Sequence, residues 1–595
     1  MTDVELTSWA HRARELAARL REHLHLLRHP QDLLACDVWQ SVPGDWQSYL
    51  EKLSFAELGR LHMDRLPTRC GDPPLSLAHF LALHEHLALH RQPADDDEEE
   101  ASDSALIGVV RSSSKSAKLH KKTHEVEKLS ALIAAVAATS HCSRAIDIGC
   151  GKGSLSAHLS VSSGLDVVGL DAQEVLTSAA AALSSRPPSA GGGRVRIWQR
   201  TVHSDEHAPA AVDGICEEAW PAAGSAAASS GVVLCALHAC GDLSPTITRC
   251  FALAPSVAAL VLVPCCYNLL TVDSDPCGAE HSPMKVGKCH PCHPCGAEES
   301  DPPSTRPSAS PSTRPSAPPS TKQARVPSVA KAAAATAGFP LSEVVRRTGL
   351  ILSRDVRWIA TQREAAALPP SWLDEASKAD GAAPPAALLA QLWRALFAAL
   401  MRDHYADCVP EGTRVSTGGH ARHRQQVAEA EGQGKARQGK AEGQGDDKVA
   451  STAGFEFVAF AEAALARAGL PANRLDRSEL ARYAAARCAD GVVNAARRVA
   501  AMTALQAALA PLVESLLLTD HVLFLHESGV CEDIRAVPVF RPARSPRNVA
   551  IVARKRMTDG PTGTGAALLL PTSQPEDAEL AACSEQVASF RLAES

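Results

Sequence analysis

The chain has 595 residues, enough for two or three domains, and 45% of them are hydrophobic, which suits a protein with a real core. Its formal net charge of −7 gives no overall sign of nucleic-acid binding, because a phosphate-binding surface would have to be a local basic patch. The start of the chain resembles no secretion signal, and no apolar run approaches the ~20 residues of a membrane span. The 18 Cys therefore indicate reduced thiols in a cytoplasmic or nuclear protein, not secreted and without a membrane partner.

The first 92 residues predict a helical module, because leucines recur there on one helix face. Those leucines are Leu16, Leu20, Leu24 and Leu27. An acidic and polar linker follows over residues 93–114, and a helix is expected from His124 to about Ala138.

From residue 144 onward, short apolar segments alternate with helical ones, which predicts βαβ units and a parallel sheet. The five expected strands are 144–149, 166–171, 194–202, 232–237 and 258–263. Two further strands, 537–540 and 549–553, are expected to form an antiparallel hairpin that closes the sheet. The sequence therefore predicts an α/β fold with seven strands, an N-terminal helical module and disordered insertions.

Two low-complexity segments interrupt this order, and both are expected to be disordered because neither can bury enough apolar surface. The first contains the tract Cys289-His-Pro-Cys-His-Pro-Cys295, with Cys277 upstream. These are zinc-like ligand types, but no second pair follows in an ordered context, so no specific metal site is predicted. The predicted division of the chain is 1–92, 93–114, 115–271, 272–335 (insertion), 336–410, 411–450 (insertion), 451–560 and 561–595 (tail).

The clearest functional motif is Asp147-Ile-Gly-Cys-Gly-Lys-Gly153, which joins an expected strand to an expected helix. Gly149, Gly151 and Gly153 remove side chains where the backbone must turn tightly, and N–H groups at the helix start can receive a carboxylate. Asp171, at the end of the next strand, can accept both hydroxyls of a ribose. The G-x-G-x-G spacing favours S-adenosylmethionine over NAD or FAD, whose pattern is G-x-G-x-x-G, and over a purely structural turn.

Polar side chains follow the fourth and fifth strands, at the end of the sheet where open parallel sheets bind ligands. His238 and Asp242 end the fourth strand, although Asp242 equally suits a helix cap. Tyr267, after the fifth strand, is a candidate for recognising a planar acceptor group. Cys265 and Cys266 fit buried small hydrophobic residues, because a metal site would need two further ligands that the sequence does not identify.

These segments together resemble the methyltransferase-like protein 25 family, which includes relatives labelled as ribosomal RNA adenine dimethylase domain-containing proteins. The matching segments are 37–39, 42–46, 121–126, 147–153, 237–242, 264–270, 338–342, 457–461, 537–540 and 545–548. The chain departs from the family at Asn268, where relatives tend to carry His, and at 117–120, where they carry Met-Ser-Pro.

The resemblance implies a Rossmann-like methyltransferase sheet and S-adenosylmethionine as the cofactor. The expected cofactor contacts are Asp147, Gly149, Gly151, Gly153, Asp171 and His124. The expected catalytic residues on the acceptor side are His238, Asp242 and Tyr267, with Glu125 as a further residue of the cleft. The expected partner is a macromolecular methyl acceptor, either RNA or a protein side chain, and the alternative is a catalytically silent scaffold that keeps the fold for binding.

Overall fold

The computed structural model describes residues 3–63, 71–93, 115–184, 192–221, 231–272, 338–362, 370, 372–378, 383–409, 445–471 and 473–556. The two segments expected to be disordered, 272–335 and 411–450, lie largely outside these residues. The tract from Cys289 to Cys295 and the tail from residue 561 lie outside them as well.

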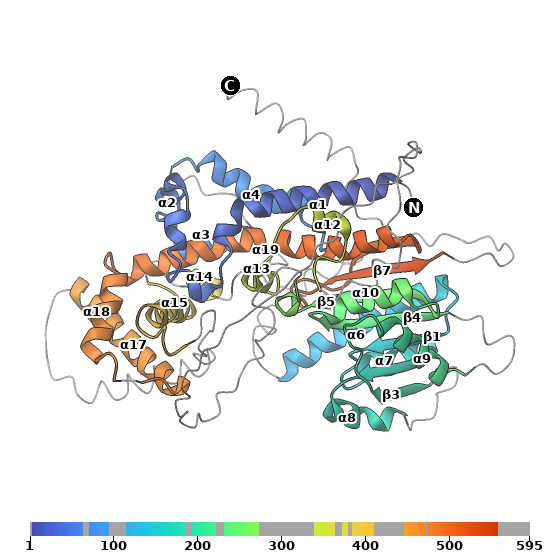
Figure 1. Cartoon of the computed structure of the whole chain (residues 1–595). Coiled ribbons are helices and arrows are strands. Elements are labelled where there is room, and N and C mark those ends of the chain that lie inside the picture. The colour runs from blue at the N-terminus through green and yellow to red at the C-terminus, as the bar shows by residue number, and fades with distance from the viewer. Residues whose placement is uncertain are drawn as a thin grey trace, which may run out of the picture.

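Seven strands form one sheet in the order β3-β2-β1-β4-β5-β7-β6. Figure 1 labels β7, β5, β4, β1 and β3 in turn along this sheet. They are β1 (Arg144–Ile148), β2 (Asp166–Asp171), β3 (Val195–Gln199), β4 (Val232–Cys240), β5 (Val257–Cys265), β6 (Cys531–Pro538) and β7 (Val549–Lys555). The first five strands are parallel, whereas β7 pairs antiparallel with both β5 and β6. The seven-stranded α/β sheet and its closing hairpin are therefore confirmed.

Helices cover both faces of this sheet, which explains why its inner strands are apolar along their whole length. The helices are α6 (Lys115–Thr139), α7 (Ser154–Ser163), α8 (Glu174–Ser184), α9 (Ala208–Ala219) and α10 (Leu243–Leu253). Residues of α9 and α10 pack with Ile146 and Val168 on one face, and residues of α6 and α7 pack with Ala145 and Val167 on the other. Neighbouring residues of one strand thus serve opposite layers, as strand geometry requires.

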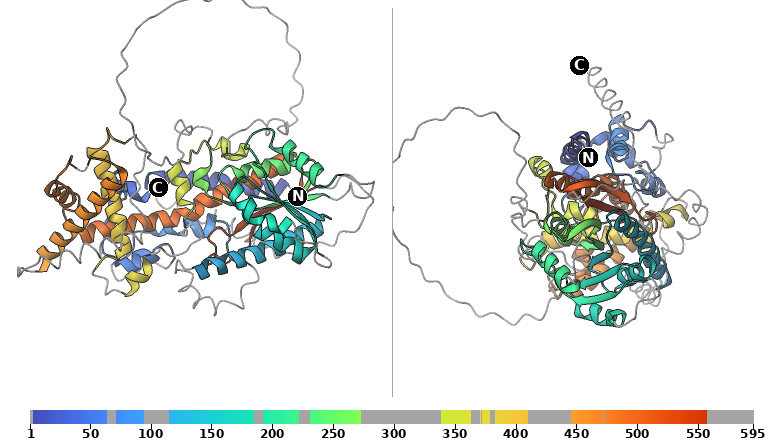
Figure 2. Two further views of the ribbon diagram at one scale, coloured as in Figure 1. Left: turned by 90° about the horizontal axis from the view of Figure 1, so that it is seen from below. Right: turned by 90° about the vertical axis from the view of Figure 1, so that its right-hand side faces the viewer.

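A second hydrophobic core lies in the helical part of the molecule, seen from two further sides in Figure 2. Its N-terminal helices are α1 (Asp3–His23), α2 (Gly44–Leu50), α3 (Phe55–Arg60) and α4 (Leu75–Leu87), with short 3-10 turns at Leu24–Leu26, Pro30–Asp32 and Val38–Ser41. The later helices are α12 (Glu343–Arg347), α13 (Arg354–Ile359), α14 (Leu373–Lys378), α15 (Ala386–His404), α17 (Gly445–Ala468) and α18 (Arg477–Arg487). Buried residues of the N-terminal helices and of the later helices therefore belong to one core, and the division of the chain into domains stays a prediction.

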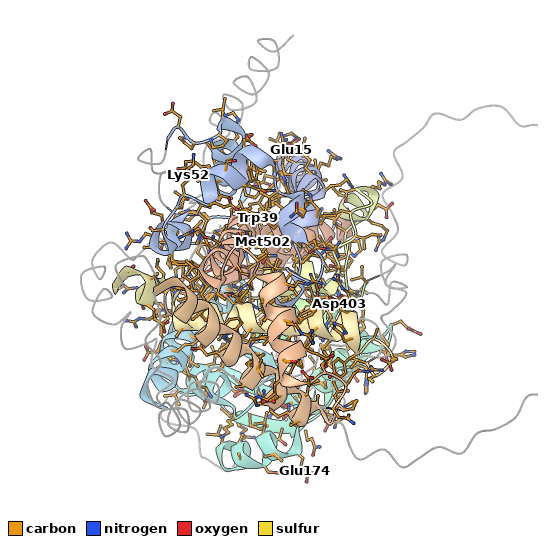
Figure 3. The ribbon with its side chains drawn as sticks, turned by 90° about the vertical axis from the view of Figure 1, so that its left-hand side faces the viewer. Glu15, Trp39, Lys52, Glu174, Asp403 and Met502 are labelled. Atoms are coloured by element: carbon orange, nitrogen blue, oxygen red, sulfur yellow. The ribbon has the colours of Figure 1, made fainter. Side chains whose placement is uncertain are left out.

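The two cores are joined by α19 (Val492–Ser528), a helix of 37 residues. It contacts α1, α4 and α15 of the helical part, and α10 and β6 of the part that contains the sheet. In Figure 3, Met502 of this helix lies inside the molecule near Trp39, whereas Lys52 and Glu174 lie at its periphery. Within the described residues, α19 is the one helix long and apolar enough to cross a membrane, but its most apolar window is wholly buried in the protein. Its composition is thus explained by its place between the two cores.

Two elements differ most from the sequence prediction in their boundaries. The helix expected from His124 begins earlier, at Lys115. The strand expected at 537–540 is β6, which begins at Cys531 and ends at Pro538. Because β6 lies at the edge of the sheet and carries exposed Glu532, its first residues lack the apolar run that reveals an inner strand.

Candidate functional site

The glycine-rich loop lies between β1 and α7, where the strand order reverses and open α/β sheets bind their ligands. Gly149, Gly151 and Gly153 all have positive φ angles, at 76°, 56° and 70°, which residues other than glycine rarely adopt. A Cβ at Gly151 would meet nothing within 4 Å, and one at Gly149 would meet only Leu243, at 3.6 Å. The loop thus borders open space at Gly151 and makes no close contact at Gly149.

The loop is fastened to the end of β2 by its own amide groups. The amides of Gly149 and Cys150 donate to the carbonyl oxygen of Leu170, and the amide of Gly151 donates to Asp171 Oδ2 at 2.9 Å. These amides are thus already paired within the protein. The glycines shape the turn, and Asp171 is placed beside it with capacity left on its carboxylate, since two oxygens offer about four acceptor positions.

Asp147 lies beneath the loop with 1% of its surface exposed. Its Oδ2 accepts a hydrogen bond from the Ser156 hydroxyl at 2.7 Å, which ties the end of β1 to α7. Burial raises the pKa of Asp147 to about 6, against the opposing effect of the Ser156 hydrogen bond. Its position indicates that Asp147 holds the loop from below.

β4 contains a bulge at His238. This residue has no paired residue in β5, and the bulge lies beside Pro264 of β5. Leu237 pairs with Val263 and Ala239 pairs with Pro264, so that the register shifts at His238. Proline has no amide hydrogen to donate, and bulges are common where it interrupts a strand. His238 accordingly adopts a φ of 63°, a left-handed conformation that is uncommon outside glycine and clusters at functional sites.

The bulge brings His238 to Glu125 of α6, with His238 Nε2 and Glu125 Oε1 3.0 Å apart. The Glu125 side chain is 6% exposed, and Lys121 Nζ lies 3.3 Å from the same oxygen. Burial on its own raises the pKa of Glu125, but the hydrogen bond and charge of His238, together with Lys121, outweigh it and lower the pKa to about 2. An ionised Glu125 accepts the hydrogen on Nε2, so the lone pair of a neutral His238 ring is on Nδ1.

The other cleft candidates have contacts of a different kind. Asp242 Oδ1 accepts a hydrogen bond from the Thr271 amide at 2.7 Å, which holds the turn after β5 to the start of α10. His124 Nε2 accepts a hydrogen bond from the Arg541 amide at 3.3 Å, and the His124 ring meets Phe540 edge-on. His124 is thus in contact with the connection between β6 and β7, and its contact with a cofactor stays a prediction.

Tyr267 lies in a buried charged network, with 1% of its surface exposed. Its hydroxyl donates to Glu514 Oε1, and burial together with the Glu514 charge raises the pKa of Tyr267 above its usual value. Glu514 also forms ion pairs with Arg91, at 2.6 Å, and Arg547, at 2.9 Å. Asn548 accepts a hydrogen bond from Arg91 as well. The Tyr267 hydroxyl therefore faces α19 and is not presented to an acceptor.

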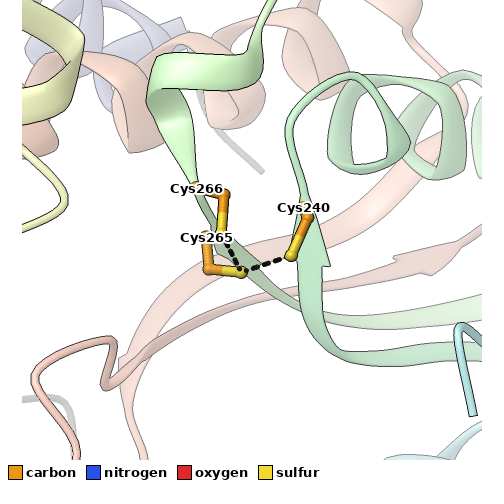
Figure 4. A group of neighbouring side chains, drawn as sticks. All are labelled: Cys240, Cys265 and Cys266. Carbon is orange, nitrogen blue, oxygen red and sulfur yellow. Dashed lines mark hydrogen bonds between the residues drawn. The ribbon is translucent and has the colours of Figure 1, made fainter. Parts of the chain in front are cut away.

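Three cysteines meet where β4 and β5 end (Figure 4): Cys240, Cys265 and Cys266. Sequence reasoning did not connect Cys240 with the other two, because the strands that carry them are separated by α10. It also treated Glu125 and His238 as independent residues, and it did not single out Glu514. A signal for Glu514 was available, since an acidic residue within a mostly apolar stretch of a helix requires a buried partner.

Residues 121–273 match a family model described as a methyltransferase domain. The chain thus contains a methyltransferase domain that includes the glycine loop, Asp171, His238 and the three cysteines. One solved structure, the plantazolicin methyltransferase BpumL in complex with SAH, is 12% identical over 28% of this chain. The chain spans 60% of that protein, and a TM-score of 0.16 gives the likeness no weight for the fold. The finer resemblance to the methyltransferase-like protein 25 family stays a prediction.

Proposed function

We propose that the protein is an S-adenosylmethionine-dependent methyltransferase that acts on a macromolecular acceptor, either RNA or a protein side chain. The observation that carries this proposal is the position of Asp171. Its carboxylate is hydrogen-bonded to Gly151 of the glycine loop, next to the point where the strand order reverses. The matching methyltransferase domain supports the same reaction.

The residues at this point fit the donor on two counts. The space over Gly151 is open, since a Cβ there would have no neighbour within 4 Å, and at Gly149 a Cβ would only reach ordinary contact with Leu243. Asp171 keeps acceptor capacity that suits the ribose hydroxyls. S-adenosylmethionine, when bound, supplies an electrophilic methyl group on a sulfonium. The chain's own residues would hold the donor through Asp171 and the loop, and align it with the acceptor.

On the acceptor side, His238 and Glu125 form a pair suited to accepting a proton. Glu125 holds His238 through Nε2, which leaves Nδ1 as the basic nitrogen of the ring. If the acceptor is a hydroxyl, its proton would pass to His238 Nδ1 as its oxygen bonds to the methyl group. A protonated amine would first give its proton to Nδ1, because its nitrogen needs a free lone pair to attack. In-line displacement needs alignment above all, so this proton transfer adds to positioning and does not replace it.

The contacts of Asp242 and Tyr267 favour the alternative, a silent scaffold, more than an enzyme. Both side chains make hydrogen bonds that hold the fold together, to the Thr271 amide and to Glu514 respectively. His238 is then the one expected catalytic residue whose described contacts suit proton transfer. A scaffold would keep the donor site and the fold but transfer no methyl group.

Two measurements separate these functions. Calorimetry of the full chain with S-adenosylmethionine and with S-adenosylhomocysteine tests the donor site, and we expect saturable binding of both. Transfer of labelled methyl groups into a lysate, with and without ribonuclease, then tests the acceptor. Label that disappears with ribonuclease identifies RNA, and label that persists in protein identifies a side chain. Donor binding without any transfer would establish the scaffold, and no retention of donor or product would overturn the proposal.

A further inference from the structure

The three cysteines at the carboxyl ends of β4 and β5 form a compact sulfur cluster, which neither the fold nor the donor site requires. Cys240 Sγ lies 3.1 Å from Cys265 Sγ, and Cys265 Sγ lies 3.6 Å from Cys266 Sγ. All three sulfur atoms lie within 4.8 Å of one another. Figure 4 shows the three side chains directed toward a common point.

The backbone accounts for this convergence. Cys240 and Cys265 are paired residues at the ends of two parallel strands, so that their side chains lie side by side. In an extended strand the next side chain would point to the opposite face. Cys266 has a φ of 50°, and this left-handed turn returns its side chain to the side of Cys265. A non-glycine residue in this conformation is uncommon, and such residues cluster at functional sites.

The distances between the sulfur atoms are closer to those between thiolates that share one metal ion than to the bond length of a disulfide. A disulfide requires about 2.05 Å between sulfur atoms, so Cys240 and Cys265 are free thiols in this structure. Thiolates bound to one tetrahedral zinc ion, with Zn–S of about 2.3 Å, lie roughly 3.8 Å apart. The observed distances of 3.1 and 3.6 Å need only small adjustments to reach that geometry.

The burial of the cluster is graded. Cys265 is buried, Cys266 is half-buried and Cys240 is exposed. A path of entry for an ion therefore exists on the Cys240 side, which a bindable metal site requires. That side adjoins the bulge, because Cys240 Sγ donates to the carbonyl oxygen of His238 at 3.3 Å.

We propose that Cys240, Cys265 and Cys266 bind a zinc ion through their three sulfur atoms, with the fourth position open at the carboxyl ends of the strands beside His238. Three protein ligands and one open position are typical of zinc sites that bind a substrate or water, whereas structural sites are closed by four ligands. The open position lies next to the bulge that carries His238, so a ligand atom of the acceptor could fill it. This site is independent of the Cys289–Cys295 tract, which lies outside the described residues.

The test uses the full chain carrying Cys277→Ser, Cys289→Ser, Cys292→Ser and Cys295→Ser, which removes the thiol ligands of the competing tract. It is purified under reducing conditions without a metal-affinity step. Elemental analysis should find about one zinc ion per chain. Exchange for Co²⁺ should give the thiolate charge-transfer band and the visible bands of tetrahedral cobalt.

Adding Cys240→Ser should abolish both signals, because it removes an exposed ligand without disturbing the core. The matched control is Cys36→Ser, another exposed cysteine, which should leave both signals unchanged. The proposal is overturned if the reduced parent protein binds no stoichiometric zinc and gives no cobalt spectrum, or if Cys240→Ser retains them. It is equally overturned if mass spectrometry of freshly prepared protein shows Cys240 and Cys265 joined in a disulfide, which would make them a redox pair.

Discussion

Tyr267 and Glu514 meet inside the protein, with the phenolic hydroxyl donating to Glu514 Oε1 at 2.8 Å. The contact joins the turn after β5 to the middle of α19, two parts of the chain that lie 247 residues apart. Because Arg91 and Arg547 also bind Glu514, this one carboxylate holds four segments together. The residue expected to recognise an acceptor instead secures the sheet to the helical region.

Replacing Glu514 with Gln should destabilise the protein more than replacing Tyr267 with Phe. Tyr267→Phe removes one hydrogen bond from a charged acceptor, at a cost of about 1–3 kcal/mol. Glu514→Gln leaves two buried arginines without their counter-charge, at a cost of about 3–5 kcal/mol. Urea unfolding measures both values, and donor affinity of the folded variants should stay within a few-fold of wild type. A Tyr267→Phe variant of unchanged stability but lost methyl transfer would instead support the catalytic role.

Asp171→Ala should weaken binding of S-adenosylmethionine by about 10- to 100-fold, because it removes a charged hydrogen-bond acceptor worth roughly 1.5–3 kcal/mol. Isothermal titration calorimetry measures the change. The matched control is Asp166→Ala at the other end of β2, whose carboxylate accepts a hydrogen bond from the Arg194 amide. We expect the control to bind normally, and equal losses in the two variants would contradict a direct role for Asp171.

Glu125→Gln and His238→Asn should each lower methyl transfer while leaving donor affinity nearly unchanged. Removal of a general base typically costs 10²- to 10⁴-fold in rate. With its pKa near 2, Glu125 stays ionised throughout the physiological range, so it should not produce the acidic limb of a pH–rate profile. Glu127→Gln, an exposed change on the same helix, provides the control. Full activity in both variants would exclude proton transfer by this pair.

Deleting residues 276–334 and joining the ends with a short flexible linker should leave donor affinity unchanged. The described residues that flank this segment are neighbours, since the Phe339 amide donates to the Thr271 carbonyl at 2.9 Å and the Gly338 amide donates to the Thr271 hydroxyl. A short linker can therefore span the gap without strain on β5. Calorimetry provides the measurement, and loss of binding in a folded deletion variant would show that the segment contributes to the site.

His521 should make the protein less stable in mild acid. Burial, with the charge of Arg249, lowers its pKa to about 3, while the unfolded chain takes up a proton below about 6.5. The contribution of neutral His521 to the free energy of unfolding is thus fully present above pH 6.5. It is lost as the pH falls toward 3, by about 1.4 kcal/mol per pH unit. His521→Asn, which can still form a hydrogen bond with Thr248, lacks this effect. Its deficit relative to wild type should shrink by about 2 kcal/mol between pH 7 and 5, and parallel urea-stability curves would contradict this.

The inner strands and the glycine loop could be predicted from the sequence because each depends on residues that are consecutive in the chain. β1, β2, β4 and β5 are apolar runs buried on two faces, and the three glycines occupy positions that require positive φ. The same holds for the hairpin, since β7 is also a buried apolar strand.

The rest depends on contacts between distant residues, which local patterns do not record. Glu125 and His238 lie 113 residues apart, and their pairing requires both the packing of α6 on the sheet and the bulge opposite Pro264. The segment from Gly338 to Ser342 shows the same limit. This segment matched the family pattern, but its sequence provided no physical reason for the match. The structure gives one, because the amides of Leu341 and Ser342 donate to the buried Asp520 of α19.

The antiparallel pairing of β5 with β7 has a consequence for synthesis of the protein. β5 ends at Cys265, whereas its outer neighbour begins only at Val549, close to the end of the described chain. While the ribosome makes the intervening residues, a fully apolar strand has one unpaired edge, the kind of surface on which nascent chains associate wrongly. Completion of the sheet therefore cannot precede the synthesis of β7, and until then the free edge of β5 is a surface that chaperones can shield.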